Sequence, residues 1–268
     1  MKDKVIVITG ASSGIGKACA EVFAKAGSNV VIAARDAHKL SEVKGALKKY
    51  TEVLGVITDV TREEDCKKLI DETIRQFGRL DVLINNAGIS MRAMFEDVDL
   101  DVIRLVMDTN FWGTIYCTKY ALPYVLKNKG SIVGISSVAG KKGLPGRSGY
   151  SASKFAMEGF LESLRIENLK KDLHVLIARP GFTASDIRKS SLSKDGTAQG
   201  ESPRDEQTMM QPEVVAEKIY NAVLNRKRDM VLTVNGMFTL WLNNFFPSLM
   251  DKMVYNHLAK EPDSPFAK

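Results

Sequence analysis

Short apolar runs alternate with segments of helical periodicity along most of this chain of 268 residues. Runs rich in valine, isoleucine and leucine predict strands at residues 5–9, 29–35, 53–58, 80–84, 131–136 and 174–178. Helical patterns between them cover residues 15–26, 38–50, 62–77, 100–127 and 150–170. Strands that are apolar at every position are typical of a parallel sheet covered on both faces. The sequence therefore predicts an α/β fold, a Rossmann-type doubly wound parallel sheet in three α/β/α layers.

The length alone permits one large domain or two small ones. No linker rich in proline, glycine or serine interrupts the alternation before about residue 183, so we expect one domain over residues 1–268. Residues 182–211 are polar and predict a long loop. A helix from Pro212 to about residue 225 and a strand at 230–234 should follow. The apolar tail, residues 236–260, predicts a helical extension that Pro247 divides into two short helices.

Charge and cysteine content exclude several functions. The net charge is +6, but the basic residues are scattered and only Arg226–Arg228 forms a tight cluster, so no nucleic-acid partner is expected. Three cysteines, Cys19, Cys66 and Cys117, are widely spaced and predict small core residues rather than a metal site. The first apolar run, Val5–Ile8, is too short for a signal peptide, and no apolar stretch of about 18 residues could span a membrane. We expect a cytoplasmic protein.

A glycine-rich segment lies between the first strand and the first helix. Here glycines let the backbone approach a pyrophosphate at the positive end of a helix. The predicted contacts are Gly10, Ser12, Ser13, Gly14, Ile15 and Gly16. The spacing G-x-x-x-G-x-G differs from the G-x-G-x-x-G fingerprint, so a tight turn of purely structural purpose is the alternative. The flanking strand and helix favour a nucleotide.

At this point the sequence resembles the short-chain dehydrogenase/reductase family, over about residues 3–234. The similar motifs, in order, are T-G-x-x-x-G-x-G at Thr9–Gly16, N-N-A-G at Asn85–Gly88, a helical asparagine at Asn110, a serine at Ser137, Y-x-x-x-K at Tyr150–Lys154 and Pro180–Gly181. The resemblance implies an enzyme that moves a hydride between a nicotinamide cofactor and a carbonyl/alcohol pair. It also implies four catalytic residues: Asn110, Ser137, Tyr150 and Lys154.

Tyr150 and Lys154 are four residues apart, so a helix presents both on one face. An unperturbed tyrosine has a pKa of about 10, and a neighbouring ammonium plus oxidised nicotinamide should lower it toward working pH. Tyr150 is then the general acid in reduction and the general base in oxidation.

The other two catalytic assignments have alternatives. The family spacing favours Ser137 as the hydroxyl that bonds the substrate oxygen, with Ser136 as its rival. By the same resemblance, Asn110 holds a water that passes protons to Lys154. Its alternative is an amide that satisfies helix backbone groups.

The resemblance also implies how the cofactor is held. Lys154 should bond the nicotinamide ribose, Pro180–Gly181 should turn the chain so that Thr183 reaches the carboxamide, and Asp59 should bond the adenine amino group. A plain turn is the alternative role for Asp59. The remaining implied contacts are Val60, Asn86, Ala87, Gly88 and Tyr150.

The end of the second strand bears on which cofactor is used. NAD-using relatives have an acidic residue there, where this chain has Ala34 followed by Arg35. A guanidinium can hold a 2′-phosphate through two charge-assisted hydrogen bonds, so we predict NADP(H), with Arg35 and Ser13 as contacts. A shift of one residue would make Asp36 the acidic residue of an NAD site, so NAD(H) is the alternative.

The tail bears on the substrate. Its apolar residues could pack on the domain or a second subunit, line a pocket for a lipophilic substrate, or contact a membrane surface peripherally. A similar extension in hydroxysteroid-dehydrogenase-like relatives favours a bulky, lipophilic ketone or secondary alcohol. The alternatives are a 3-ketoacyl thioester reductase and a non-catalytic dinucleotide-binding regulator. We expect residues 182–211 to act as a substrate lid, no metal ion, and a homodimer or homotetramer.

Overall fold

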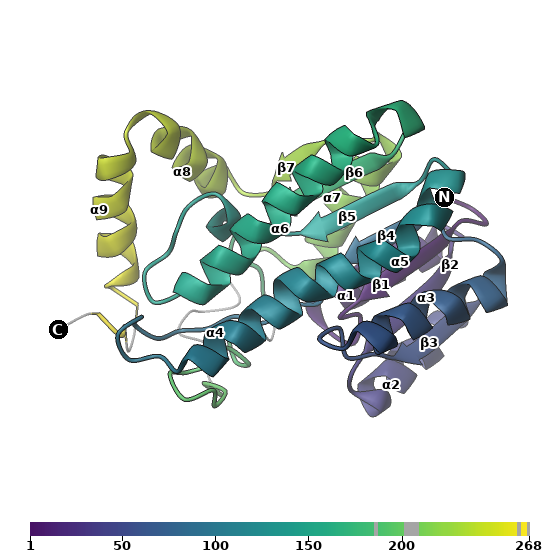
Figure 1. Cartoon of the computed structure of the whole chain (residues 1–268), viewed down its shortest axis with the longest axis horizontal. Helices are drawn as coiled ribbons and strands as arrows, with labels where there is room; N and C mark the ends of the chain where they lie inside the picture. The colour runs from purple at the N-terminus through teal and green to yellow at the C-terminus, as the bar shows by residue number, and fades with distance from the viewer. Residues whose placement is uncertain (185–186, 201–208, 262–263, 267–268) are drawn as a thin grey trace.

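The computed structural model describes residues 1–184, 187–200, 209–261 and 264–266. Its centre is a seven-stranded parallel sheet in the order β3-β2-β1-β4-β5-β6-β7 (Figure 1). The strands are β1 (Val5–Thr9), β2 (Asn29–Ala34), β3 (Val53–Ile57), β4 (Val82–Asn85), β5 (Ser131–Ile135), β6 (His174–Arg179) and β7 (Asp229–Val231). The order reverses beside β1, between β1 and β4, as in a doubly wound sheet. The predicted fold class is confirmed.

Helices cover both faces of the sheet. One layer holds α1 (Gly14–Lys25), α2 (Ala37–Leu47) and α7 (Pro212–Leu224), and the other holds α3 (Glu63–Phe77), α5 (Gly113–Lys127) and α6 (Ser148–Glu167). Successive residues of β1 serve the two cores, since Ile6 and Ile8 pack in the first and Val5 and Val7 in the second. This is why the strand is apolar at every position.

Several boundaries differ from the sequence prediction, including three near the carboxyl ends of the strands. The single helix expected at 100–127 is divided into α4 (Leu100–Met107), a π-helical turn (Asp108–Trp112) and α5. Helix α6 begins at Ser148, before Tyr150. Strand β7 ends at Val231 because Thr233 begins the next helix, where its hydroxyl accepts from the Gly236 N–H at 3.1 Å.

The tail forms two helices, α8 (Val234–Phe245) and α9 (Pro247–Leu258), with Pro247 in the first turn of α9. Figure 1 shows them standing apart from the two helical layers. Ion pairs fix both ends of α9. Asp251 pairs with Lys142, and Glu261 lies 3.6 Å from Arg92 and 3.8 Å from Arg147. Among the helices that the structure describes, none is both long and apolar enough to cross a membrane.

A buried carboxylate holds the amino-terminal edge of the sheet. Asp81 accepts the backbone N–H of Val5 at 2.9 Å and two bonds from the Arg79 guanidinium at 2.7 and 2.8 Å, and Lys4 lies 3.2 Å away. Burial alone would raise the pKa of Asp81, but these donors outweigh it and the pKa lies below its ordinary value. The charge therefore ties β1 to β4 at the edge opposite the site described below.

Asp81→Asn should lower the free energy of unfolding by about 2–4 kcal/mol, because it leaves the arginine and lysine without their carboxylate. The loss should shrink as the pH falls below about 4, where the unfolded-state carboxylate takes up a proton, and should vanish only below the lowered folded-state pKa, where both states are protonated. Urea denaturation at several pH values measures both effects. Asp172→Asn, which breaks an exposed pair with Arg226, is the control and should change stability by less than about 1 kcal/mol. Equal losses in the two variants would contradict the assignment.

Candidate active site

A cavity of about 1640 Å³ opens at the carboxyl ends of the strands. Its walls come from the segments that follow β1 to β6, and from α8 and α9. In an open α/β sheet this edge, at the point where the strand order reverses, is where ligands bind. The topology therefore brings residues from Gly10 to Thr183 to one place, and the tail helices add residues up to Leu258.

The glycine-rich loop is shaped by a neighbouring asparagine. The Asn86 side-chain amide donates to the carbonyl oxygens of Thr9 at 2.9 Å and Gly10 at 3.0 Å. The Thr9 hydroxyl accepts from the backbone N–H of Asn86 at 3.1 Å and of Ala87 at 3.0 Å. Gly10 has a φ of +63°, and a Cβ there would lie 2.8 Å from the Ala87 Cα. The two motifs thus form one rigid unit that requires glycine.

The same loop fits the pyrophosphate of a dinucleotide. Ser13 precedes α1 in an extended conformation, and its side chain does not cap the helix. The first-turn N–H groups are therefore not taken up by that side chain, and Ser12, Ser13, Gly14 and Ile15 line the cavity. Helix N-termini of this kind carry partial positive charge and bind phosphate groups.

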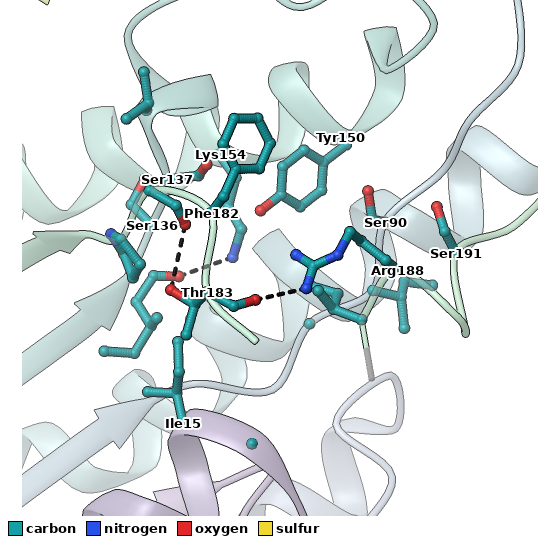
Figure 2. Close-up of a pocket in the computed structure, with 18 of the residues that line it drawn as sticks. Ile15, Ser90, Ser136, Ser137, Tyr150, Lys154, Phe182, Thr183, Arg188 and Ser191 are labelled. Carbon is teal, nitrogen blue, oxygen red and sulfur yellow. Dashed lines mark hydrogen bonds between the residues drawn. The ribbon is translucent and has the colours of Figure 1, made fainter. Parts of the chain in front are cut away.

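Tyr150, Lys154 and Ser137 converge on the cavity (Figure 2). The Lys154 Nζ donates to the Ile135 carbonyl oxygen at 2.9 Å and lies 5.8 Å from the centre of the Tyr150 ring. The Ser137 hydroxyl accepts from the Ala139 N–H at 3.2 Å and lies close enough to the Tyr150 phenol to lower the pKa of that phenol. A phenol, a hydroxyl and an ammonium thus share one wall.

Burial shifts the pKa values of Tyr150 and Lys154 in the directions that favour their uncharged forms. Burial raises the pKa of Tyr150, against the opposing effects of the Ser137 hydrogen bond and the Arg147 charge. Burial also lowers the pKa of Lys154 to about 8, and the nearby Glu158 carboxylate opposes this. The lowered Tyr150 pKa expected from the sequence stays a prediction for the complex with oxidised nicotinamide.

Ser136, the rival of Ser137, is engaged elsewhere. Its buried hydroxyl donates to the Glu158 Oε1 at 2.6 Å. Among the described residues, the Ser137 hydroxyl donates no such bond to a carboxylate; it lines the cavity and lowers the pKa of the Tyr150 phenol. The geometry favours Ser137 as the substrate-facing hydroxyl.

Asn110 lies behind the wall rather than in it. Its side chain is fully buried in the π-helical turn, accepts the Ile89 N–H at 2.8 Å, and donates at 2.9 Å to both the Ile89 carbonyl and the Ser153 hydroxyl. The Asn110 amide therefore bonds the backbone of the segment after β4. The alternative expected from the sequence was an amide that bonds the backbone of a helix. The water-holding role stays a prediction.

At the opposite end of the cavity, Ala34 ends β2 and Arg35 follows it into the lining. Asp36 caps α2 by accepting the Lys39 N–H at 3.0 Å. Asp59 lines the cavity, and one of its carboxylate oxygens accepts from the Thr61 N–H at 3.0 Å and the Thr61 hydroxyl at 2.8 Å. Asp59 is thus a turn-forming residue that also faces the ligand space.

Most of the predicted residues line the cavity: Gly10, Ser12, Ser13, Gly14, Ile15, Arg35, Asp59, Val60, Asn86, Ala87, Gly88, Ser137, Tyr150, Lys154, Pro180, Gly181 and Thr183. Gly16 and Asn110 are absent from the lining that the structure describes, and both support it from behind. The predicted lid, 182–211, includes residues 185–186 and 201–208, which lie outside the described residues. From the described part of that segment, Phe182, Ile187, Arg188, Leu192, Gln199 and Met210 also line the cavity.

Pocket lining was one of three alternative roles that the sequence left open for the apolar tail, and on α9 Met250, Met253, Val254, His257 and Leu258 do line the cavity. Sequence reasoning missed the buried pair of Glu158 and Arg179. The available signals were that Glu158 lies one helical turn after Lys154, and that Arg179 directly precedes Pro180.

Comparison with known proteins agrees with this geometry. A family model described as short chain dehydrogenase matches residues 4–196. Dehydrogenase/reductase SDR family member 7B of Danio rerio is 36% identical over 97% of this chain and 87% of that protein. An 11-beta-hydroxysteroid dehydrogenase A of Sesamum indicum is 36% identical over 97% of this chain and 78% of that protein.

Solved structures agree as well. A short-chain dehydrogenase/reductase from Burkholderia phymatum in complex with NAD superposes with a TM-score of 0.83, at 25% identity over 92% of this chain and 95% of that chain. An alcohol dehydrogenase from Thermococcus sibiricus, complexed with 5-hydroxy-NADP, has a TM-score of 0.76 at 24% identity over 86% of this chain and 96% of that chain, and supports the fold alone. This chain therefore belongs to the short-chain dehydrogenase/reductase family, as an enzyme that acts on CH–OH or C=O groups with NAD(P).

Proposed function

We propose that this protein is an NADP(H)-dependent oxidoreductase that interconverts a bulky, lipophilic ketone and its secondary alcohol, with Tyr150 as general acid/base. The observation that carries the proposal is the convergence of Tyr150, Ser137 and Lys154 on a cavity whose far wall is built by the apolar tail. The proton transfer and the binding of a lipophilic substrate then each have a structural basis.

The bound nicotinamide supplies or accepts the hydride. In reduction, Tyr150 donates its phenolic proton to the substrate oxygen, and the Ser137 hydroxyl bonds the same oxygen and shares its developing charge. The Lys154 ammonium beside the ring favours the phenolate that results. In oxidation, the phenolate takes the proton back.

Tyr150→Phe should lower kcat by about 10²–10⁴-fold, because it removes the proton donor and leaves the ring in place. Dinucleotide affinity, measured by calorimetry, should stay within about threefold, since one of many cofactor contacts is lost. Tyr120→Phe on α5, where the hydroxyl bonds Glu63 at the surface, is the matched control and should keep full activity. Undiminished turnover in Tyr150→Phe would refute the mechanism.

The position of Arg35 supports NADP(H). The strand ends at Ala34, so the first side chain beyond it is a guanidinium facing the cavity, and the carboxylate of Asp36 is engaged as a helix cap. In the cavity lining that the structure describes, no acidic side chain then occupies the place at the end of β2 that would bond the ribose hydroxyls and repel a 2′-phosphate.

Arg35→Ala should reduce the preference for NADPH over NADH by about 10- to 100-fold in kcat/KM, because a charge-assisted contact with the 2′-phosphate is lost. Initial rates with both cofactors measure the ratio. Lys39→Ala, one turn along α2 and outside the cavity lining, is the control for a simple loss of positive charge. A wild-type preference for NADH would overturn the assignment.

The substrate class follows from the tail. Helix α9 presents Met250, Met253, Val254 and Leu258 to the cavity, and α8 adds Phe238. An apolar wall of this size favours a lipophilic substrate over a small polar one. Named relatives include hydroxysteroid dehydrogenases, which is consistent with this class.

Val254→Trp should lower kcat/KM for a polycyclic or long-chain ketone by about tenfold or more, and for a small ketone by much less, because the indole fills space that only the larger substrate needs. Asn256→Trp, on the same helix but exposed and outside the lining, is the control. The two variants should fold equally well by circular dichroism. Equal losses of kcat/KM for small and large ketones would contradict the proposal that α9 contacts the substrate.

Three further expectations stay predictions. The segment 182–211 is proposed to act as a lid, since its described residues contact both the cavity and Met91. Exposed apolar residues of α8, including Trp241 at 56% and Phe245 at 63% exposure, are available for a second subunit of a homodimer or homotetramer, or for peripheral membrane contact. A cytoplasmic location is the third.

A further inference from the structure

Glu158 is a fully buried carboxylate on the catalytic helix, outside the set of residues that the mechanism uses. Its Oε1 accepts from the Arg179 Nε at 2.8 Å and from the Ser136 hydroxyl at 2.6 Å, and its Oε2 accepts from the Arg179 Nη2 at 2.7 Å. The Lys141 ammonium lies 3.5 Å from Oε2. A buried charge is tolerated only when it is paired and bonded in this way.

Glu158 and two of its partners lie on three segments that carry proposed site groups. Ser136 directly precedes Ser137 at the end of β5, and Arg179 directly precedes the Pro180–Gly181 turn at the end of β6. Glu158 itself lies one turn after Lys154, on α6. The Glu158 carboxylate therefore joins three segments: the one that carries Ser137, the one that carries the Pro180–Gly181 turn, and the helix that carries Tyr150 and Lys154.

The site around Glu158 is also tightly packed. A Cβ added at Gly140 would collide with both the Glu158 carboxylate and the Ser136 hydroxyl. Arg179 is fixed on its other side by Asp229 of β7, which accepts from Nη1 at 3.1 Å. Such a fork-shaped pair leaves little freedom in any of the joined segments.

We propose that Glu158 is a positioning residue: it sets the spacing of Ser137, Lys154 and the Pro180–Gly181 turn, and it places a carboxylate one helical turn from the Lys154 ammonium. This rests on the proposed function of those three groups. It adds to that function a reason why a buried ion pair stands at this edge of the sheet. A hydrophobic pair of similar volume would serve stability as well or better.

The charges around Lys154 support the electrostatic half of the proposal. On α6 it has Tyr150 one turn before and Glu158 one turn after. From β5 the Ile135 carbonyl oxygen accepts a hydrogen bond from its ammonium, and from the turn before α5 the uncharged Asn110 lies near by, across Gly88. Arg179 and Lys141 pair with Glu158, and Asp229 pairs with Arg179. Glu158 is thus the carboxylate whose charge opposes the effect of burial on the Lys154 pKa.

The test is Glu158→Gln in the full chain, with three readouts. The first is the titration of Lys154 without cofactor, followed by NMR of ¹³C-labelled lysine and assigned by the signal lost in Lys154→Arg. The second is calorimetric affinity for NADP⁺. The third is kcat and KM across pH 6 to about 10.

In Glu158→Gln the Lys154 titration should move to lower pH by about half a unit or more, because the favourable charge is gone. Wild-type activity should fall at high pH as Lys154 loses its proton, and in the variant this fall should begin at a correspondingly lower pH. At the optimum, kcat should fall by about tenfold or more through misplacement of the joined segments, and NADP⁺ affinity by about threefold or more. An unmoved titration, with kcat and affinity within twofold of wild type, overturns the proposal.

Asp81→Asn is the matched control, because Asp81 is also a buried carboxylate paired with an arginine, but at the opposite edge of the sheet. It should destabilise the protein and leave the Lys154 titration, the affinity and kcat unchanged at a temperature where it is folded. If it changes them as Glu158→Gln does, the effects are those of general destabilisation and the proposal fails.

Ser136→Ala is the milder variant, to be used also if Glu158→Gln does not fold. It removes only the hydroxyl that donates to Glu158, so kcat should fall several-fold while the Lys154 titration and NADP⁺ affinity stay unchanged. Unchanged kcat would overturn the positioning of Ser137. An active Tyr150→Phe, in contrast, would refute the proposed function, while the lysine titration would still decide the effect of the Glu158 charge.

Discussion

The parallel arrangement of the strands is the constraint on which the rest of the molecule depends. Because all seven strands run the same way, their carboxyl ends meet at one edge, and every connection must cross back over a face. Gly10, Ser137 and Gly181 are far apart in the chain, yet each follows directly or closely on a strand end and faces the same cavity. The chemistry at that edge is a product of topology first and of side-chain identity second.

Two buried carboxylates show how one kind of interaction serves different purposes at the two edges. Asp81 accepts hydrogen bonds from backbone and side-chain donors and does not line the cavity, so its contribution is to strand alignment. Glu158 is bonded as closely, but its neighbours include the groups that would handle protons and cofactor. A charge is costly to bury in either place. At the carboxyl edge, the charge of Glu158 also acts on Lys154, whose proposed role requires the ammonium form.

The sequence predicts the sheet well because strands buried on both faces leave unbroken apolar runs, as in Val5–Ile8. It predicts the motif residues because their spacing is fixed by single turns and helices. The π-helical turn at Asp108–Trp112 escaped prediction because one extra residue in a helix leaves no distinct periodicity. The Glu158–Arg179 pair and the cavity face of α9 depend on contacts between distant elements, which local pattern does not encode.

The attachment of α9 has a consequence for how such a protein can diversify. The helix forms one side of the cavity but is fixed at its ends by Asp251 and by Glu261, through ion pairs with residues of the loops rather than through the central sheet. Its inner residues can therefore be exchanged without disturbing the layers that hold the dinucleotide. With α9 in its proposed role as a substrate wall, selection on what the enzyme accepts and selection on how it reacts act on separate parts of one chain, so new substrate ranges are open to it at little risk to the chemistry.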